Sequence, residues 1–294
     1  MRFTNSLQLG IVSVLFFINL LWLPIAEASH ARYGHINWEP RTDLSETTVD
    51  FRIVTAFRRS YFGNLQLGDK FSPGSISFGD GKSGNYSFEV IALNTQEDWV
   101  IGQASQAGMA AGVVRHQYPT KAQSNGQPWQ VQLSVCCRIG SLRNSANSNF
   151  IVFATVDLSK DNSSPVSSLP PIVTCARGEC RFSVPVIDKE QDKIRWSLTA
   201  LGQSGISRQP SGLTLDSETG FIDWSQGSES ADLGLYALSV TIQDLDEFDE
   251  PKSTVVTDFI INLRDFIDNQ PPSFDSPPTP SHGATIKAIV GQVL

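Results

Sequence analysis

The strictest constraint on the fold is the alternating segment at residues 235–244 (LYALSVTIQD). Large apolar side chains occupy every second position: Tyr236, Leu238, Val240 and Ile242. The positions between them carry small or polar side chains: Ala237, Ser239, Thr241 and Gln243. Successive side chains point to opposite faces of a β-strand, so this pattern predicts a strand with one face in a core and the other facing outward.

Turn-forming residues punctuate the preceding segment, residues 210–224 (PSGLTLDSETGFIDW). The turn-forming residues are Pro210, Gly212, Asp216 and Gly220, and short apolar pairs lie between them. This spacing is typical of a meandering antiparallel sheet. The two segments together resemble the P-x-G-L-x-L-D-x-x-T-G-x-I and Y-x-L-x-V-x-x-x-D signatures of cadherin-like and immunoglobulin-like surface repeats, including the dystroglycan-type cadherin-like domain. The resemblance implies a β-sandwich in a long extracellular protein, with a role in adhesion or spacing rather than in catalysis.

The N-terminus has the features of a secretory signal peptide at residues 1–28. Arg2 precedes an apolar run at residues 10–23, and Ala26 and Ala28 form a small-x-small cleavage site. An uncleaved membrane anchor is the alternative, although about 14 apolar residues span a bilayer only marginally. No other segment approaches the ~20 apolar residues that a spanning helix needs. We therefore expect a secreted or cell-surface protein, attached to a membrane only through parts outside this sequence.

The composition is that of an all-β secreted protein. The 294 residues include 22 glycines and 16 prolines, which favours many turns, and only 18% of the residues are charged. The formal net charge of −8 argues against a nucleic-acid partner, because nucleic-acid-binding proteins usually show a basic patch. After loss of a signal peptide, the length suits about two domains.

The first predicted domain comprises residues 29–158. Its clearest strands are alternating or apolar segments at residues 49–57, 129–135 and 149–157. The turn sequence SFGDG at residues 77–81, with the later HQY at residues 116–118, resembles the polycystic-kidney-disease-type β-sandwich. The two motifs are farther apart here than in that family, so we expect extra strands or a long loop between them.

The second predicted domain comprises residues 173–267, and its seven or so short strands suit an immunoglobulin-like sandwich. Residues 159–172 are rich in Ser and Pro and predict a linker, which Pro170 and Pro171 would hold extended. Residues 268–294 contain N-x-P-P-x-F and V-G-Q-x-L, as at the start of a further repeat. We expect tandem immunoglobulin-like or cadherin-like β-sandwiches in a longer array; a disordered tail is the alternative.

The four cysteines suggest disulfides, as in other secreted proteins. Cys175 and Cys180 flank a four-residue segment with Gly178, and we expect them to be bonded to each other. Cys136 and Cys137 are adjacent, and neighbouring Cα atoms lie closer than most disulfides allow. They could form a vicinal disulfide, remain free thiols, or bridge to Cys175 or Cys180.

Acidic residues form the main candidate for a ligand site, because calcium prefers several closely spaced carboxylate and carbonyl oxygens. They follow the ends of three predicted strands and comprise Asp188, Glu190, Asp192, Asp244, Asp246, Asp265, Asp268 and Asn269. In part they resemble the cadherin calcium cage, with Asp244 and Asp246 as its D-x-D pair and residues 265–269 as its linker. Ile267 departs from that motif, which has Asn there. The alternative is that these residues only form turns.

Catalytic signatures are not evident in the sequence: there is no Ser-His-Asp triad, phosphate loop or dinucleotide motif, and the histidines lack metal-ligand spacing. We therefore expect a non-catalytic protein for adhesion, matrix contact or spacing, stiffened by calcium, whose partner is a surface protein or a glycan. The alternative is a carbohydrate-binding accessory module of a larger secreted enzyme. Its sugar surface would use the aromatic side chains at residues 37–40 and 57–62.

Overall fold

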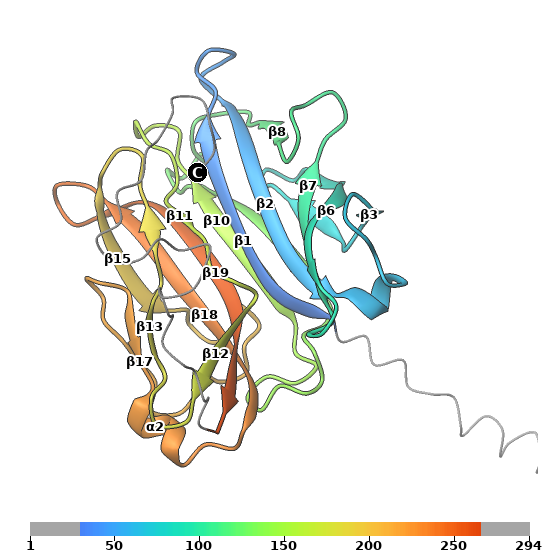
Figure 1. Cartoon of the computed structure of the whole chain (residues 1–294). Helices are drawn as coiled ribbons and strands as arrows, with labels where there is room; N and C mark the ends of the chain where they lie inside the picture. Colours follow the sequence, from blue (N-terminus) through green and yellow to red (C-terminus); the bar gives the residue numbers. More distant parts are fainter. Residues whose placement is uncertain (1–29, 266–294) are drawn as a thin grey trace, which may run out of the picture.

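The computed structural model describes residues 30–265 and is almost entirely β-structure, as the sequence predicts. Two β-rich units lie side by side, the first coloured blue to green and the second yellow to red (Figure 1). The predicted signal peptide and the start of a further repeat lie outside the described residues.

The first unit contains ten strands and one 3-10 helix, η1 (Arg59–Phe62). The strands are β1 (Ala31–Pro40), β2 (Thr48–Arg58), β3 (Lys70–Phe71), β4 (Ser75–Ser77), β5 (Ser83–Asn85), β6 (Ser87–Asn94), β7 (Trp99–Ser105), β8 (Val114–Gln117), β9 (Trp129–Val135) and β10 (Phe150–Val156). Alternation decides which side chains enter the core: in β9, Val131 and Leu133 are fully buried whereas Gln130 and Ser134 are exposed.

The second unit contains nine strands and a short helix, α2 (Ser225–Glu229). The strands are β11 (Val166–Ser167), β12 (Ile172–Ala176), β13 (Arg181–Ser183), β14 (Val186–Ile187), β15 (Lys193–Leu198), β16 (Thr214–Leu215), β17 (Phe221–Asp223), β18 (Gly234–Leu245) and β19 (Pro251–Arg264). The apolar face of β18 is buried, as its alternation predicts. Ala237 and Ser239 on its other face are also buried, which the alternation did not predict.

Strand β19 joins the two units. One of its edges pairs with β18 along most of its length, from Ser253 to Leu263. Its other edge meets β10 at Val255 and β1 at Asp258, and then pairs with β12 in parallel. The two units therefore share one continuous set of paired strands. The two units thus lie side by side and are joined by strand pairing.

The predicted linker, residues 159–172, is packed between the units. Ser164 donates its backbone N–H to the Trp38 carbonyl (3.0 Å), and its hydroxyl accepts from the Trp38 N–H (2.8 Å). Farther along, the Pro171 carbonyl accepts a hydrogen bond from the Ile260 N–H (3.0 Å). Four polar side chains of this segment are buried: Asn162, Ser163, Ser164 and Ser167. The segment thus adds backbone hydrogen bonds to the junction.

An ion pair lies inside this junction. Arg138 of the first unit and Asp258 of the second are 1% and 0% exposed, and two nitrogen–oxygen contacts of 2.5 and 2.7 Å join them. Arg138 also donates to the carbonyls of Ser204 (2.8 Å) and Asn149 (3.1 Å). A small apolar cluster contains residues of both units, among them Ile139, next to Arg138 in the sequence, and Ile260, two residues after Asp258. Its members are Ile139, Leu142, Ile206, Ala237 and Ile260.

Candidate functional site

Three of the predicted calcium ligands meet at one end of the second unit. Carboxylate oxygens of Asp188, Asp192 and Asp244 all lie within 4.8 Å of one another. Asp188 follows β14, Asp192 precedes β15, and Asp244 lies near the end of β18. The β15–β18 pairing, which places Ile194 opposite Asp244, brings the short 188–192 loop to the end of β18. We call these three residues the acidic cluster.

Asp244 is the buried centre of the acidic cluster, with no exposed surface. One carboxylate oxygen accepts from the backbone N–H and the hydroxyl of Ser253, at 2.6 and 2.7 Å. The other accepts from the amide Nδ2 of Asn162 at 2.6 Å. Burial nevertheless raises the pKa of Asp244, because removal from water disfavours the charged form more than these hydrogen bonds favour it.

Two buried oxygen atoms beside Asp244 have no hydrogen-bond partner among the described residues. One is Oδ2 of Asp188, whose Oδ1 accepts from the Asp192 N–H at 2.8 Å. The other is Oδ1 of Asn162, a side chain that is 2% exposed. Burial, followed by the charges of Asp244, Asp192 and Glu190, raises the pKa of Asp188. Buried polar atoms normally have partners, so these two oxygens are the buried ones at the acidic cluster that remain free to accept a further contact.

One lysine partly balances the negative charge. Lys252 contacts Asp192 through its ammonium group at 2.5 Å. Burial alone would lower the pKa of Lys252. The hydrogen bond to Asp192 and the charges of Asp192, Asp244 and Glu190 together outweigh burial, so the pKa is raised. Glu190 lies at the edge and accepts from the Ser163 hydroxyl at 2.8 Å. The four carboxylates and one ammonium leave a negative local charge.

The other predicted ligands do not join the acidic cluster. Asp246 accepts from the backbone N–H groups of Phe248 (2.9 Å) and Glu250 (3.0 Å), and so forms the β18–β19 turn. Asp265 lies past the far end of β19, roughly 40 Å along the strand from Ser253, and pairs with Arg177 at 3.6 Å. Asp268 and Asn269 lie outside the described residues. The structure therefore does not bring Asp244 and Asp265 together into the expected cage.

Sequence reasoning missed Asn162, which contributes an amide oxygen and a hydrogen bond to the acidic cluster. Its signal is the run of Asp, Asn and Ser at residues 157–164, a composition that also suits a linker. The aromatic residues proposed for a sugar surface are only partly accessible. Trp38 is 2% exposed and Phe57 is fully buried, so neither ring is available to stack on a sugar, whereas Phe62 is half-buried and Tyr61 is 49% exposed.

Both pairs of cysteines form disulfides. Cys175 and Cys180 are bonded across the short loop that follows β12, with their Cα atoms 4.9 Å apart. Cys136 and Cys137 are bonded to each other just after β9. Of the alternatives left open by the sequence for the adjacent pair, the structure has the vicinal disulfide.

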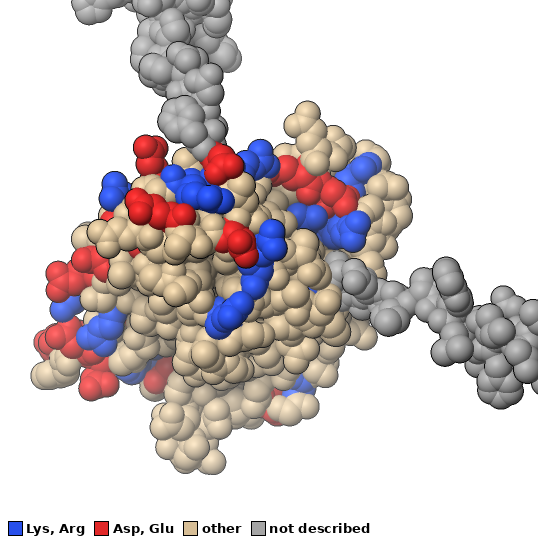
Figure 2. All heavy atoms as spheres, turned by 90° about the horizontal axis from the view of Figure 1, so that it is seen from below, with Lys and Arg blue, Asp and Glu red and all other residues tan. Residues whose placement is uncertain are grey.

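Charged side chains are mixed on the face shown in Figure 2. The visible Lys and Arg side chains of the described residues lie among Asp and Glu and form no broad basic patch. Within residues 30–265, no helix is long and apolar enough to cross a membrane.

Two family models match the chain, one for each unit. The model for the N-terminal part of integrin beta-like proteins A–E matches residues 32–159, and the "Putative Ig domain" model matches residues 164–258. The second match agrees with the immunoglobulin-like sandwich expected for that unit. The boundary between the two matches falls in the packed segment that joins β10 to β11.

Three relatives from Dictyostelium discoideum match across both units. Integrin beta-like protein A is 29% identical over 85% of this chain, protein B is 27% identical over 78%, and protein C is 26% identical over 89%. The chain spans only 13, 11 and 15% of the lengths of these relatives. No solved structure matches the chain.

Proposed function

We propose that this chain is a non-catalytic, extracellular adhesion segment of a larger cell-surface protein. The observation that carries the proposal is the similarity to integrin beta-like proteins, which extends over 85% of the chain and therefore includes both units and their junction. The immunoglobulin-like match of the second unit supports it, because such β-sandwiches recur in cell-surface proteins.

The shared strand β19 suits a segment that bears load. A pull on one unit reaches the other through the β18–β19 hydrogen bonds and through the contacts of β19 with β1 and β10. The buried pair of Arg138 and Asp258 lies on the same route. An adhesion segment benefits from such a junction, because its binding surface keeps a fixed orientation under force.

A bead assay tests the adhesion proposal. Beads coated with the purified protein should attach to cells more than albumin-coated beads do, and excess soluble protein should compete for that attachment. Protein that has been reduced and alkylated is the control for non-specific stickiness, because it carries the same sequence without its disulfides. Attachment no greater than that of albumin-coated beads would contradict the proposal.

We further propose that the acidic cluster binds calcium. Its donors are all oxygen atoms, the ligand type that calcium prefers. Among them, Oδ2 of Asp188 and Oδ1 of Asn162 have no hydrogen-bond partner among the described residues and are therefore available to a cation. A divalent cation would also relieve the repulsion among carboxylates that, after burial, contributes to the raised pKa of Asp188. Residues from the packed segment, the 188–192 loop and β18 would then be tied together.

Thermal melting tests calcium binding. A ligand that binds only the folded protein stabilises it by about 1–2 kcal/mol at a five- to fiftyfold excess over Kd. Extracellular modules bind calcium with Kd on the order of 10⁻⁴–10⁻³ M, so the comparison is ~5 mM calcium against excess chelator. The melting temperature should rise with calcium and should not rise in Asp188→Asn. Asp246→Asn is the matched control, because Asp246 lies in the turn and should leave the rise intact. An equal melting temperature in both buffers would show that the carboxylates only form structure.

A further inference from the structure

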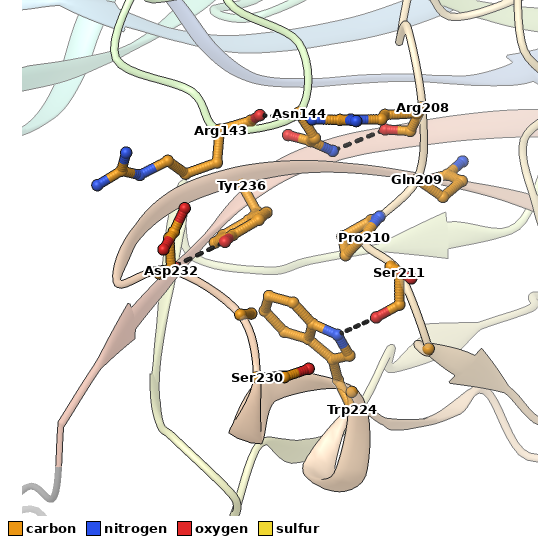
Figure 3. A pocket seen from close by; sticks show the side chains of 13 residues that line it. Arg143, Asn144, Arg208, Gln209, Pro210, Ser211, Trp224, Ser230, Asp232 and Tyr236 are labelled. Carbon is orange, nitrogen blue, oxygen red and sulfur yellow. Dashed lines mark hydrogen bonds between the residues drawn. The ribbon is translucent and has the colours of Figure 1, made fainter.

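A separate cavity lies at the junction of the two units, and nothing in the proposed calcium site uses it. Its volume is about 440 Å³, within the range of small-ligand pockets. The loop between β9 and β10 forms one wall through Arg143 and Asn144, and residues 208–236 of the second unit form the rest (Figure 3). Tyr236 in its wall is roughly 25 Å along β18 from Asp244 of the acidic cluster. We call this cavity the junction pocket.

The walls of the junction pocket are fixed by hydrogen bonds across the two units. The Asn144 amide donates to the carbonyls of Arg208 (2.7 Å) and Ala237 (2.8 Å) and accepts from the Ala237 N–H (2.8 Å). On the opposite side, the Trp224 indole donates to the Ser211 carbonyl at 2.8 Å, as Figure 3 shows. A ligand would therefore meet a preformed cavity and would not need to order its walls.

Two guanidinium groups in the junction pocket have no carboxylate partner among the described residues. Arg143 donates to the Leu233 carbonyl at 2.9 and 3.0 Å, and Arg208 donates to the Arg143 carbonyl at 3.3 Å. Most of their N–H donors remain available, because each guanidinium carries five. Their side chains extend in different directions (Figure 3), so in a chain with a net charge of −8 they offer two separate contacts for acidic groups.

Polar side chains other than the two arginines also line the pocket. Asp232, Gln209 and Ser230 line it and can donate to or accept from hydroxyl groups. The aromatic rings offer little surface, since Trp224 is 1% and Tyr236 is 8% exposed. These rings therefore give little surface on which a hydrophobic peptide side chain or a lipid could bind, and the polar side chains match a ligand with acidic groups and several hydroxyls.

We propose that the junction pocket binds a saccharide that carries carboxylates or sulfates. One acidic group would contact Arg143 and another would contact Arg208, and the hydroxyls would bond to Asp232, Gln209 and Ser230. This inference rests on the proposed adhesive function and gives it a ligand class, an acidic glycan. The pocket needs both units, because Arg143 comes from the first and Arg208 from the second.

Titration calorimetry with four probes of similar length tests the inference: a hyaluronan tetrasaccharide, a heparin tetrasaccharide, maltotetraose and tetraglutamate. At least one acidic saccharide should bind, and the neutral maltotetraose and tetraglutamate should bind about tenfold more weakly or not at all. Arg143→Gln and Arg208→Gln should each weaken the acidic saccharide about tenfold without changing the melting temperature. Arg52→Gln is the matched control, because Arg52 is an exposed arginine on β2.

Three outcomes would overturn the inference. Equal binding of maltotetraose would remove the role of the charge, tighter binding of tetraglutamate would assign the pocket to acidic peptides, and no binding of any probe would remove the site. The bead assay separates this failure from failure of the proposed function. Attachment that persists in Arg143→Gln/Arg208→Gln would keep adhesion and reject the pocket as its ligand site, whereas saccharide binding without attachment would do the reverse.

Discussion

Arg138 and Asp258 show how a buried charge is tolerated at the residue scale. Every nitrogen of the guanidinium has a partner: one donates to Asn149, and the others to Asp258 and Ser204. The guanidinium also lies 5.1 Å from the centre of the Phe150 ring, a cation–π distance. Burial raises the pKa of Asp258 even though Arg138 lowers it, so the carboxylate depends on this arginine for its charge.

Removing Arg138 should therefore destabilise the protein strongly. In Arg138→Met, Asp258 remains buried without its partner, and we expect the free energy of unfolding in urea at pH 7 to fall by about 3–5 kcal/mol. Replacing both residues, Arg138→Met with Asp258→Leu, should recover most of that loss, because no unpaired charge is then buried. A single variant that loses less than about 1 kcal/mol would show that the pair contributes little.

His35 should make the stability pH-dependent. It lies buried on β1 with its Nδ1 2.8 Å from the Tyr33 hydroxyl, and burial lowers its pKa to about 4. The unfolded chain binds this proton near pH 6.5, so the stabilisation is complete above pH 6.5 and is lost as the pH falls toward 4. We expect a loss of about 3 kcal/mol over that range, because one pKa unit corresponds to about 1.4 kcal/mol.

Urea unfolding at several pH values between 7 and 4 measures this loss. His35→Gln cannot gain the proton and should show a flatter profile over the same range. Parallel profiles for the two proteins would assign the pH dependence to other groups.

At the scale of elements, the sequence predicts the strand β18 and its apolar face but not the burial of its other face. Its alternation identifies the apolar face correctly, because a period of two is independent of what lies around the strand. The burial of Ala237 depends on the loop after β9, about 90 residues earlier in the chain, and Ser239 bonds to Thr199, 40 residues earlier. No local pattern reports such a long-range contact, and small side chains are compatible with either environment.

The candidate site was predictable to a similar degree. The spacing of Asp188 and Asp192 and the position of Asp244 at a strand end favoured oxygen ligands, and the structure brings these three together. The predicted link to Asp265 relied on a local motif. It ignored that β19 runs away from the β18–β19 turn, which carries Asp265 to the opposite end of the unit. Asn162 could not be assigned, because it lies in a segment without periodicity and is 82 residues away from Asp244 in the sequence.

Gly205 should be essential for the loop after β15 to dock on the first unit. Its φ is +75°, and an added Cβ would overlap the Asn149 carbonyl oxygen. Gly205→Ala should therefore lose about 1–2 kcal/mol from the backbone conformation and a further 1–3 kcal/mol from the overlap. Gly202→Ala is the matched control: its φ is +89°, but its Cβ would meet nothing within 4 Å. Equal losses of stability in the two variants by urea unfolding would exclude the docking contact as the cause.

On the scale of the whole molecule, we expect the two units to unfold together. They share β19, the buried Arg138–Asp258 pair and an apolar cluster, so neither unit keeps its core when the other unfolds. Calorimetry should show one transition whose calorimetric and van't Hoff enthalpies agree. Limited proteolysis should leave residues 159–172 uncut, because this segment is hydrogen-bonded between the units. Two separate transitions would instead support independently folding domains.

The position of β19 at the end of the described chain has a consequence for synthesis. A ribosome delivers the chain from its N-terminus, so Arg138 emerges 120 residues before Asp258, the carboxylate that neutralises it. At about 5–20 residues per second, the nascent first unit waits several seconds or more with an unpaired arginine and with an uncovered strand edge on β1. Exposed strand edges recruit other chains. We therefore expect the first unit to present this edge to other chains until its C-terminal neighbour arrives.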